Sequence, residues 1–565
     1  MQADCHTTGY PNIDRPWLKY YSDQAAQAPL PSETMYGFLL RRNEGHLSDI
    51  ALRYFGTTIT YRTLIKRIQE AAAAFTAMGI RAGDVVTIMS MHTPETIYSV
   101  YALNYIGAVA DLVYMTLSEE ELIETVRAAN SKLLLILDVA LDRVENSIKN
   151  KAIAIPIVVL SVADSMPIYM KFAYSIKQRR KHNFPTWKTF LGKALTAPQQ
   201  VDDCLADAVI VYTSGTTGVS KGVVLDSFSF NSIVVQLNST DRNHARRDTV
   251  LHFLPLFTAF GISMLHGYLS TGMEVNLFIG FDGDAVGKEF QRVKPNRFVA
   301  GPVILDGLMR QVKGDMSYCI EITGGGAAIS PDKEREFNSF LADHGAKTKY
   351  LNGYGMSEIC GAAATNQAIP YRAGSVGIPL VKTNIRILDL NTDEDLQIGA
   401  EGEICFATPG MMKGYLNNPE ETSNATFIDS DGVKWLRTGD VGHVDKDGFI
   451  FVTGRKKRIY VVKDASGVVY KLFPQRIEDC VESCTSVEKC GVVVVPDEKR
   501  INAPEVYVTL NVNSDLTAVQ EELWHLVSSE LPEHMRPKAI HIIESIPLTE
   551  SGKIDYRTLQ KMTAA

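Results

Sequence analysis

Apolar residues in the first quarter of the chain follow two alternating periods. Between residues 60 and 80, Leu64, Ile68 and Phe75 fall on one face of a helix, and Gly79 is expected to end that helix. The β-branched run DVVTIM follows, and ETIYSVYALNYIGAV then predicts a second buried helix that ends at Gly107. The pattern therefore predicts alternating helices and strands.

Short apolar runs later in the chain are typical of strands that are buried on both faces. Such runs, separated by helical segments, are KLLLILD, AVIVYT, EVNLFIG, RFVAG and CIEITGGG. This alternation predicts an α/β fold of mostly parallel sheets covered by helices.

A charged segment that contains glycine divides the chain near its end. In GFIFVTGRKKR a strand-like run is followed by bases, and the remaining residues carry strand and helix signals of their own. A chain of 565 residues also exceeds the size of a single hydrophobic core. We predict a large N-terminal domain over residues 1–457 and a small, mobile α+β C-terminal domain over residues 458–565, joined by a hinge.

The composition narrows the functional classes. Apolar residues make up 45% of the chain and charged residues 22%, which is typical of a globular protein, and the net charge of −8 does not favour a nucleic-acid partner. Cys480, Cys484 and Cys490 lack a Cys-x-x-Cys pair and a nearby His, so we expect packed thiols in a reducing compartment. The chain starts without a signal-peptide pattern and its apolar runs are too short to span a membrane, so we expect a cytoplasmic location.

The segment 166–190 is unusual because it mixes aromatic residues with several bases. A basic amphipathic helix is typical of peripheral contact with an anionic membrane, and a solvated surface helix is the alternative. Both interpretations stay open.

The segment VYTSGTTGVSKGVVL, residues 211–225, concentrates glycine and hydroxyl residues between two β-branched runs. Its spacing does not match a Walker loop, but glycines allow backbone N–H groups to approach phosphate oxygens, and hydroxyls and a lysine add donors and charge. A structural turn is the alternative. The candidate phosphate-binding residues are Thr213, Ser214, Gly215, Thr216, Thr217, Gly218 and Lys221.

This segment resembles the phosphate loop of the adenylate-forming (AMP-binding) superfamily, which includes acyl-CoA synthetases, peptide-synthetase adenylation domains and luciferases. The resemblance extends from about Thr58 to Leu559 through TGGGAAIS, NGYGMSE, WLRTGD, GRKKR and PLTESGK, in the order of the family. It implies that a carboxylate reacts with ATP to give an acyl-adenylate and pyrophosphate, and that a thiol then takes the acyl group. The chain most resembles fatty-acid-type acyl-CoA ligases.

The resemblance also implies roles for individual residues. Lys553 corresponds to the mobile catalytic lysine, and Glu358 to a catalytic ligand of Mg²⁺. Tyr354 corresponds to the residue that stacks on adenine, whereas Asp440 and Arg455 correspond to ribose contacts, with an Asp440–Arg455 salt bridge as the structural alternative. The remaining candidates for ATP binding are Gly325, Gly326, Ala327, Gly355 and Ser357.

Three positions depart from the family pattern. Arg458 stands at the hinge, where Asp or Lys is usual, and we expect a solvated side chain that can still swivel. Thr258 replaces a frequent His and cannot neutralise an ammonium, which argues against amino acids as substrates. The thiol-acceptor loop KDASGVVYKLFP is longer than usual and contains one glycine, Gly467. The predicted pocket is apolar and roomy, and its candidate residues are Phe257, Thr258, Phe260 and Gly353, near Ala259, Ala362 and Ala363.

We therefore expect an ATP-dependent acid–thiol ligase that uses ATP, Mg²⁺ and coenzyme A and acts on a fatty or other apolar acid. Three alternatives stay open. The acceptor is a carrier-protein phosphopantetheine, or the substrate is an aryl or bile acid, or the chain is a non-catalytic nucleotide-binding protein.

Overall fold

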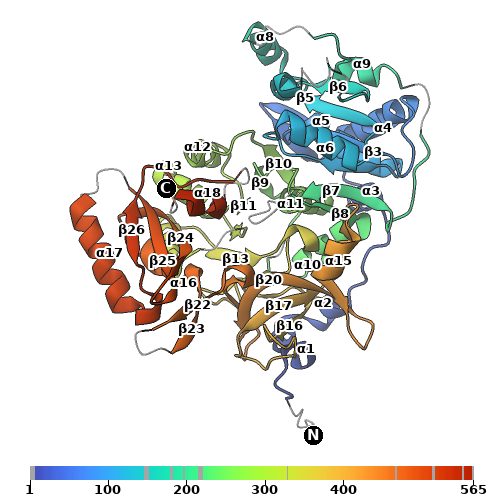
Figure 1. Cartoon of the computed structure of the whole chain (residues 1–565). Coiled ribbons are helices and arrows are strands. Elements are labelled where there is room, and N and C mark those ends of the chain that lie inside the picture. The colour runs from blue at the N-terminus through green and yellow to red at the C-terminus, as the bar shows by residue number, and fades with distance from the viewer. Residues whose placement is uncertain are drawn as a thin grey trace.

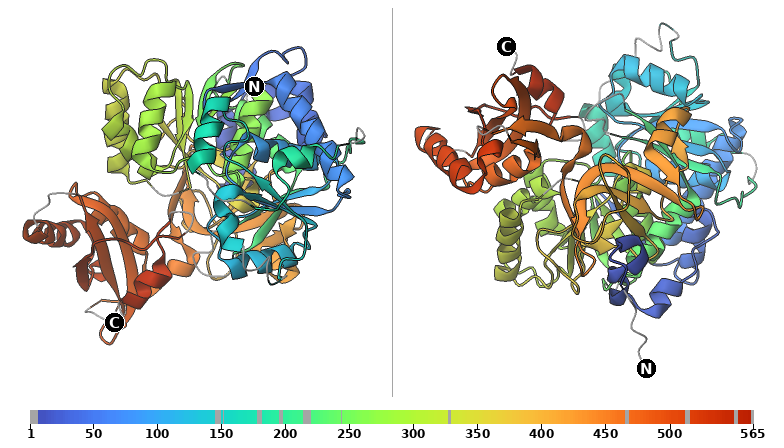
Figure 2. Two further views of the ribbon diagram at one scale, coloured as in Figure 1. Left: turned by 90° about the horizontal axis from the view of Figure 1, so that it is seen from above. Right: turned by 60° about the horizontal axis from the view of Figure 1, so that its bottom comes forward.

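The protein consists of helix-covered sheets and a smaller C-terminal lobe that lies to one side of them (Figures 1 and 2). This arrangement confirms the predicted α/β class with a small C-terminal part. The computed structural model describes residues 7–144, 150, 152–177, 182–194, 198–213, 220–242, 244–326, 329–464, 468–511, 516–549 and 553–562.

One sheet of seven strands contains most of the early apolar runs. Its first five strands in the chain pair in parallel, and the last two pair antiparallel. In spatial order the strands are β18 (Gly414–Tyr415), β8 (Gly222–Asp226), β7 (Asp207–Tyr212), β4 (Val109–Leu112), β3 (Val85–Met89), β5 (Leu133–Leu137) and β6 (Ile157–Leu160). Every residue of β4, β5 and β6 is buried, as the apolar runs predict.

A second sheet of nine strands has a parallel centre and antiparallel ends. Its strands, in spatial order, are β15 (Ile378–Pro379), β14 (Ala364–Thr365), β13 (Tyr350–Tyr354), β12 (Glu321–Gly324), β11 (Arg297–Val299), β9 (Thr249–His252), β10 (Glu274–Leu277), β1 (Ile50–Tyr54) and β2 (Thr57–Thr60). The carboxyl ends of β12 and β13 lead into the predicted nucleotide motifs.

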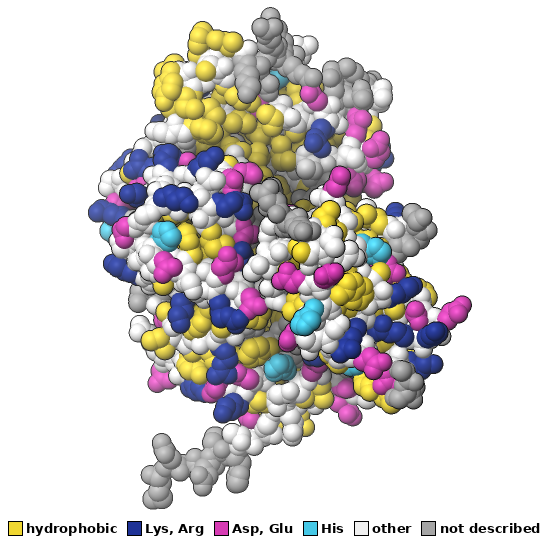
Figure 3. Space-filling model, turned by 90° about the vertical axis from the view of Figure 1, so that its left-hand side faces the viewer, with side chains coloured by type: hydrophobic (Ala, Val, Ile, Leu, Met, Phe, Trp, Pro, Cys, Tyr) yellow, Lys and Arg dark blue, Asp and Glu magenta, His cyan; other side chains and the backbone are white. Residues whose placement is uncertain are grey.

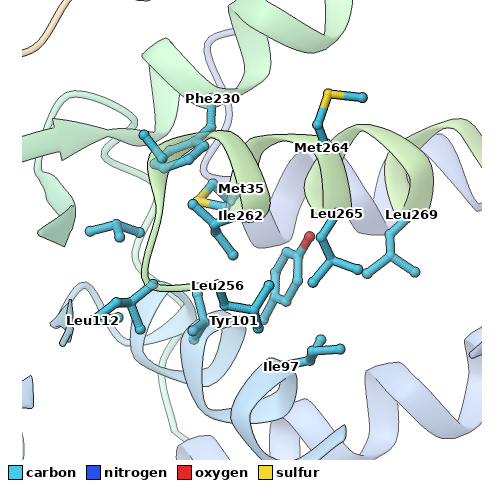
Figure 4. Close-up of a cluster of buried hydrophobic side chains, with 14 of the residues drawn as sticks. Met35, Ile97, Tyr101, Leu112, Phe230, Leu256, Ile262, Met264, Leu265 and Leu269 are labelled. Atoms are coloured by element: carbon cyan, nitrogen blue, oxygen red, sulfur yellow. The ribbon is translucent and has the colours of Figure 1, made fainter. Parts of the chain in front are cut away.

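Apolar helices fill the space between these two sheets. Helix α11 (Ala259–Thr271) packs on β10, α5 (Pro94–Tyr105) packs on β4, and α3 (Met35–Arg42) contacts both helices. Figure 4 shows Leu265 and Leu269 of α11 beside Tyr101 of α5. The Tyr101 hydroxyl is 2.8 Å from Nδ1 of His266, so these two buried polar side chains are paired with each other.

Among the other helices of the N-terminal part, α10 (Ser227–Asn238) packs on α11 and α3, and the rest cover the outer faces of the sheets or lie at their margins. The helix predicted from residue 60 is α4, and its Thr60 side chain caps Thr63 N–H. These helices are α1 (Pro11–Asp14), α2 (Asp23–Gln27), α4 (Tyr61–Ala77), α6 (Glu119–Ala128), α8 (Ile168–Lys177), α9 (Trp187–Leu191), α10 (Ser227–Asn238), α12 (Gly283–Val293), α13 (Pro302–Gln311), α14 (Pro331–Asp343) and α15 (Pro419–Ala425). Among the described residues, no helix has the length and apolar character needed to cross a membrane.

A third, antiparallel sheet connects the two large sheets to the C-terminal lobe. It consists of β16 (Asn384–Leu388), β17 (Gly402–Ala407), β20 (Lys434–Val444), β19 (Thr426–Ile428) and β21 (Ile450–Arg455).

The C-terminal lobe has its own hydrophobic cluster, which includes Ile477, Val506 and Leu523. Cys484 and Cys490 are buried free thiols in this cluster, and Cys480 packs against it. The elements of the lobe are β22 (Tyr460–Lys463), β23 (Val469–Leu472), α16 (Pro474–Glu482), β24 (Val487–Asp497), β25 (Ile501–Leu510), α17 (Leu516–Glu530), β26 (Ala539–Ile542) and α18 (Tyr556–Met562). The boundary at residues 457 and 458 stays a prediction.

Candidate nucleotide and acid site

The predicted phosphate loop connects the antiparallel strands β7 and β8. Thr213 N–H donates to the Lys221 carbonyl oxygen (3.0 Å), and Lys221 N–H donates to Thr213 Oγ1 (3.2 Å). These bonds close the base of the loop. Because a strand rather than a helix follows, the loop differs from a Walker loop in structure as well as in spacing. The candidates Ser214, Gly215, Thr216, Thr217 and Gly218 lie outside the described residues.

Lys221 points from the end of this loop toward a cluster of polar side chains. Its ammonium forms an ion pair with Glu421 of α15 and lies 4.8 Å from the ring centroid of Tyr415. The Lys221 ammonium also lowers the pKa of the Glu421 carboxyl. The Tyr415 hydroxyl in turn donates to Glu358 Oε1 at 2.8 Å. Tyr415 thus connects the phosphate-loop lysine with the predicted metal ligand.

Glu358 lies in the short 3₁₀ turn η3 (Ser357–Ile359) after β13 and is buried. The chain reaches this turn through Gly355, where a Cβ atom would lie 2.0 Å from the carbonyl oxygen of Gly361. Glycine is therefore required there for steric reasons. Among the described residues, the Tyr415 hydroxyl donates to Oε1 of the Glu358 carboxylate. The other carboxylate oxygen, Oε2, is therefore available to a ligand.

Asp440 and Arg455 face each other across the third sheet. They are register partners on β20 and β21, and Arg455 Nε lies 2.8 Å from Asp440 Oδ1. Oδ2 accepts a hydrogen bond from the Tyr354 hydroxyl at the end of β13. Burial raises the pKa of Asp440, and the Arg455 guanidinium opposes this shift. The salt bridge considered as the structural alternative is therefore present, and it lies beside the predicted adenine residue.

The glycine-rich candidates lie at the ends of β12 and β13. Gly325 follows β12 and is half-buried, whereas Gly326 is exposed and has a φ of 84°, a conformation that favours glycine. Gly353 pairs with Thr365 across β13 and β14. Ser357 begins η3, and Ala327 lies outside the described residues.

Lys553 is exposed on the C-terminal lobe in a closed turn. Lys553 N–H donates to Thr549 Oγ1 (3.2 Å), and Thr549 N–H donates to the Lys553 carbonyl oxygen (2.6 Å). Desolvation and the Arg455 guanidinium lower the pKa of Lys553, whereas Asp440 and Glu358 act in the opposite direction. The ammonium is therefore near enough to these three charged groups to interact with them electrostatically.

The acid-pocket candidates lie at the N-terminal end of α11. The ring centroids of Phe257 and Tyr114 are 4.7 Å apart. Thr258 caps the helix: its Oγ1 accepts from Gly261 N–H (3.1 Å) and donates to the Pro255 carbonyl oxygen (2.8 Å). Thr258 therefore uses its hydroxyl within the protein.

Phe260 lies in close contact with the backbone just after Glu358. A Cβ on Gly361, which has a φ of 96°, would lie 2.8 Å from the Phe260 Cα. Ala362 is half-buried and Ala363 is buried. The apolar candidates and the predicted metal ligand thus occupy one region of the molecule.

The expectation that the Arg458 side chain is solvated is wrong, because this side chain is held by partners within the protein. Its guanidinium forms an ion pair with the buried Glu478 (2.8 Å), donates to the Val492 carbonyl oxygen (2.9 Å), and lies 3.7 Å from the ring centroid of Tyr556. All three partners belong to the C-terminal lobe. Gly467, the candidate of the thiol-acceptor loop, lies outside the described residues, in the connection between β22 and β23.

Two residues of the site were not found from the sequence. Tyr415 and Glu421 both lie in the segment GYLNNPEET, where the side chain of Asn418 caps α15. The run Asn-Pro-Glu-Glu is a helix-start signal, but it carries no information about a partner 200 positions earlier in the chain.

Comparisons with known proteins place this geometry in a family. Long-chain-fatty-acid–CoA ligase of Bacillus subtilis is 28% identical over 567 residues, which cover 96% of this chain and 97% of that protein. 4-Coumarate–CoA ligase 4 of Arabidopsis thaliana is 27% identical over 530 residues, covering 89% and 86%.

Solved structures show the same fold. The crystal structure of ATP-bound MatB from Rhodopseudomonas palustris has a TM-score of 0.79 at 21% identity, covering 93% of this chain and 98% of that one. O-Succinylbenzoate CoA synthetase of Bacillus subtilis, in complex with its acyl-adenylate intermediate, has a TM-score of 0.75 at 23% identity, covering 93% and 97%.

Two family models match this chain, one after the other along the sequence. The AMP-binding enzyme model matches residues 39–416, and the model of the AMP-binding enzyme C-terminal domain matches residues 476–553. These matches confirm the predicted superfamily and, at the level of the family, the prediction of an AMP-forming ligase. This chain belongs to the AMP-binding enzyme family.

Proposed function

We propose that this protein activates an apolar carboxylic acid as an acyl-adenylate, with release of pyrophosphate, and then transfers the acyl group to coenzyme A. The observation that carries this proposal is the convergence of Lys221, Glu358 and Asp440 from separate segments of the chain, through the contacts that Tyr415 and Tyr354 make.

The chemistry of the first step explains why cations are needed. A carboxylate has to approach an α-phosphate that is already negative, so the barrier is largely electrostatic. In this proposal Lys553 lies between the two reactants and offsets their repulsion. Lys221 binds phosphate oxygens, for which it exchanges its ion pair with Glu421.

The nucleoside would be held at the pair of β20 and β21. Asp440 accepts hydrogen bonds from the ribose hydroxyls, and Arg455 and Tyr354 keep its carboxylate in place. Because Asp440 is 5% exposed, its orientation is determined by these partners rather than by solvent. The ring of Tyr354 would then lie beside the adenine.

The residues present fit a Mg²⁺ ion that is shared with ATP. Mg²⁺ commonly binds one or two carboxylates together with substrate phosphates and water. Glu358 offers a buried carboxylate with one oxygen bonded to Tyr415, and no group of three or more metal-binding side chains occurs among the described residues. When bound, the ion would neutralise charge on the phosphates.

The substrate class follows from the α11 end of the site. The Thr258 hydroxyl is hydrogen-bonded within the helix cap, and the side chain has no charge that could pair with an α-ammonium. The neighbouring Phe257 and Phe260 are apolar. The relatives act, by their names, on long-chain fatty acids and on 4-coumarate. Both substrates have acyl groups built on a hydrocarbon chain or an aromatic ring, without an ammonium, and both relatives are CoA ligases, so we include fatty and aryl acids in the proposal and take coenzyme A as acceptor.

A panel of acids tests this function. Pyrophosphate release should be measured with fatty, aryl and bile acids and with amino acids, each with and without coenzyme A. We expect release with apolar acids, an acyl-CoA product, and a higher turnover when coenzyme A is present. Pyrophosphate release with amino acids but with none of the other acids would refute the proposed substrate class. Adenylation without acyl-CoA formation would favour a carrier-protein acceptor.

A further inference from the structure

Helix α8 exposes a stripe of large apolar side chains. Ile168, Phe172 and Ile176 recur every four residues and are 86%, 69% and 59% exposed, and the neighbouring Tyr169 is 73% exposed. Single exposed apolar residues scattered over the surface are normal in soluble proteins. Four of them on one short helix instead form a contiguous apolar surface.

The opposite side of α8 is attached to the protein. Met170 and Tyr174 pack against the main hydrophobic core, and the Tyr174 hydroxyl donates to Asp138 Oδ1 at 3.1 Å. Because a helix turns once every 3.6 residues, Ile168, Phe172 and Ile176 fall on the side away from Met170 and Tyr174. The packing that holds the helix therefore also directs the apolar stripe outward.

The charge around this stripe differs in sign from that of the whole chain. Residues 165–201 contain seven Lys or Arg and no Asp or Glu, whereas the chain as a whole carries a net charge of −8. Lys171, Lys188 and Lys193 are exposed. Residues 179–181, Arg-Arg-Lys, lie outside the described residues.

These features are found together at one end of the molecule. Helix α8 lies at the top of the view in Figure 1. In Figure 3, hydrophobic side chains gather at this end of the molecule, and further hydrophobic surface lies directly below them in the view.

We propose that α8 is a docking helix that attaches this protein reversibly to the surface of an anionic lipid bilayer. Apolar residues on one face and bases next to them are the two signals that bind an amphipathic helix in the interface of such a bilayer. An acid-free segment of 37 residues in an acidic protein is complementary to anionic headgroups, and the outward side chains enter the acyl boundary. The inference does not depend on the proposed function.

Co-sedimentation of the full-length protein with vesicles tests the inference. One set of vesicles contains phosphatidylcholine only, and the other also contains phosphatidylglycerol. We expect binding to the anionic vesicles, at least about tenfold weaker binding to neutral ones, and a loss of binding as the salt concentration rises.

Two variants and a control separate the contributions. Ile168→Ser, Phe172→Ser and Ile176→Ser combined should lower binding at least about tenfold, and Lys171→Gln with Lys188→Gln should lower it only for anionic vesicles. Ile428→Ser, at a residue of β19 that is 70% exposed, serves as the matched control and should bind normally. The charge variant keeps the test valid if the serine variant does not fold.

Three outcomes would overturn the inference. These are no binding of the wild-type protein to anionic vesicles, normal binding of both the serine variant and the charge variant, and a wild-type dimer that the serine variant converts to a monomer. The last outcome would show that the stripe is an interface between two copies. The rate of acyl-CoA synthesis with a water-soluble acid should be equal in all variants. A failure of the membrane-binding inference can therefore be distinguished from a failure of the proposed function.

Discussion

Replacing Lys553 with Ala tests the electrostatic origin of the proposed catalysis. The side chain is exposed on its lobe and sits in a turn held by two hydrogen bonds, which join the backbone of residue 553 to the side-chain hydroxyl and the backbone N–H of Thr549. Both bonds involve backbone atoms of residue 553 and survive the substitution. The change therefore removes a charge and leaves the local fold.

The size of the effect follows from Coulomb's law. A unit charge about 4 Å from another contributes about 4 kcal/mol at an effective dielectric constant of about 20. This corresponds to about a thousandfold in rate. Because Lys553 is exposed in the present arrangement, solvent screens part of this energy. We expect adenylation to fall by about two to three powers of ten.

Separate half-reactions give the decisive assay. Acyl-adenylate formation is measured as pyrophosphate release without coenzyme A, and thioester formation is measured from supplied acyl-adenylate. The first rate should fall in Lys553→Ala, whereas the second should change less than about threefold. Lys561→Ala, at an exposed lysine of α18, is the matched control. An equal loss of both half-reactions would refute the assigned role.

The pH dependence provides an independent check on the same residue. Desolvation and Arg455 lower the pKa of Lys553 below its usual 10.5, so the ammonium loses its proton as the pH rises through that lowered value. As the pH is raised, the rate of wild-type adenylation should therefore begin to fall before pH 10.5 is reached. The Lys553→Ala enzyme should not show this alkaline fall. The same alkaline decline in both proteins would assign it to another group.

Three further changes test other parts of the account. Asp440→Asn should raise the KM for ATP about tenfold or more in steady-state kinetics, because it removes an acceptor for ribose, and an unchanged KM would exclude the ribose contact. Arg458→Lys keeps the charge but loses the planar contact with Tyr556, so kcat for adenylation should fall while the KM for ATP is unchanged, and an unaltered kcat would contradict a link between the hinge and the Lys553 segment. Glu321→Gln should lower the free energy of unfolding in urea by about 3–5 kcal/mol, because it removes the carboxylate that pairs with the buried Arg242, and a loss below about 1 kcal/mol would refute this. Burial alone would raise the pKa of Glu321, but its cationic neighbours hold that pKa below its usual 4.5, so this contribution should be present above pH 4.5 and lost as the pH falls through the lowered value.

Local pattern was sufficient for the fold and for part of the site. The apolar stripe from Leu64 to Phe75 became α4, and LLLIL became the fully buried β5, because burial of an apolar face determines both. Motif order was enough to predict the family, and it selected Asp440 and Arg455, which are neighbours across two strands.

Long-range contacts were beyond the sequence pattern. Nothing local indicates that Lys221 pairs with Glu421 or that Tyr415 connects it to Glu358, because these contacts join segments about 60 to 200 residues apart. Arg458 shows the same limit. Its charge suggested a solvated side chain, but Glu478 and Tyr556 supply a buried partner and an aromatic face that appear only when the lobe folds.

Acid-dependent exchange of radiolabelled pyrophosphate into ATP, without any thiol, tests the central claim most directly. The account predicts that an apolar acid and Mg²⁺ together support exchange in the wild-type protein, since adenylation is reversible, and that Lys553→Ala lowers the exchange rate by about two to three powers of ten. ATP binding without any acid-dependent exchange would contradict the claim and would indicate a nucleotide-binding protein that does not catalyse adenylation.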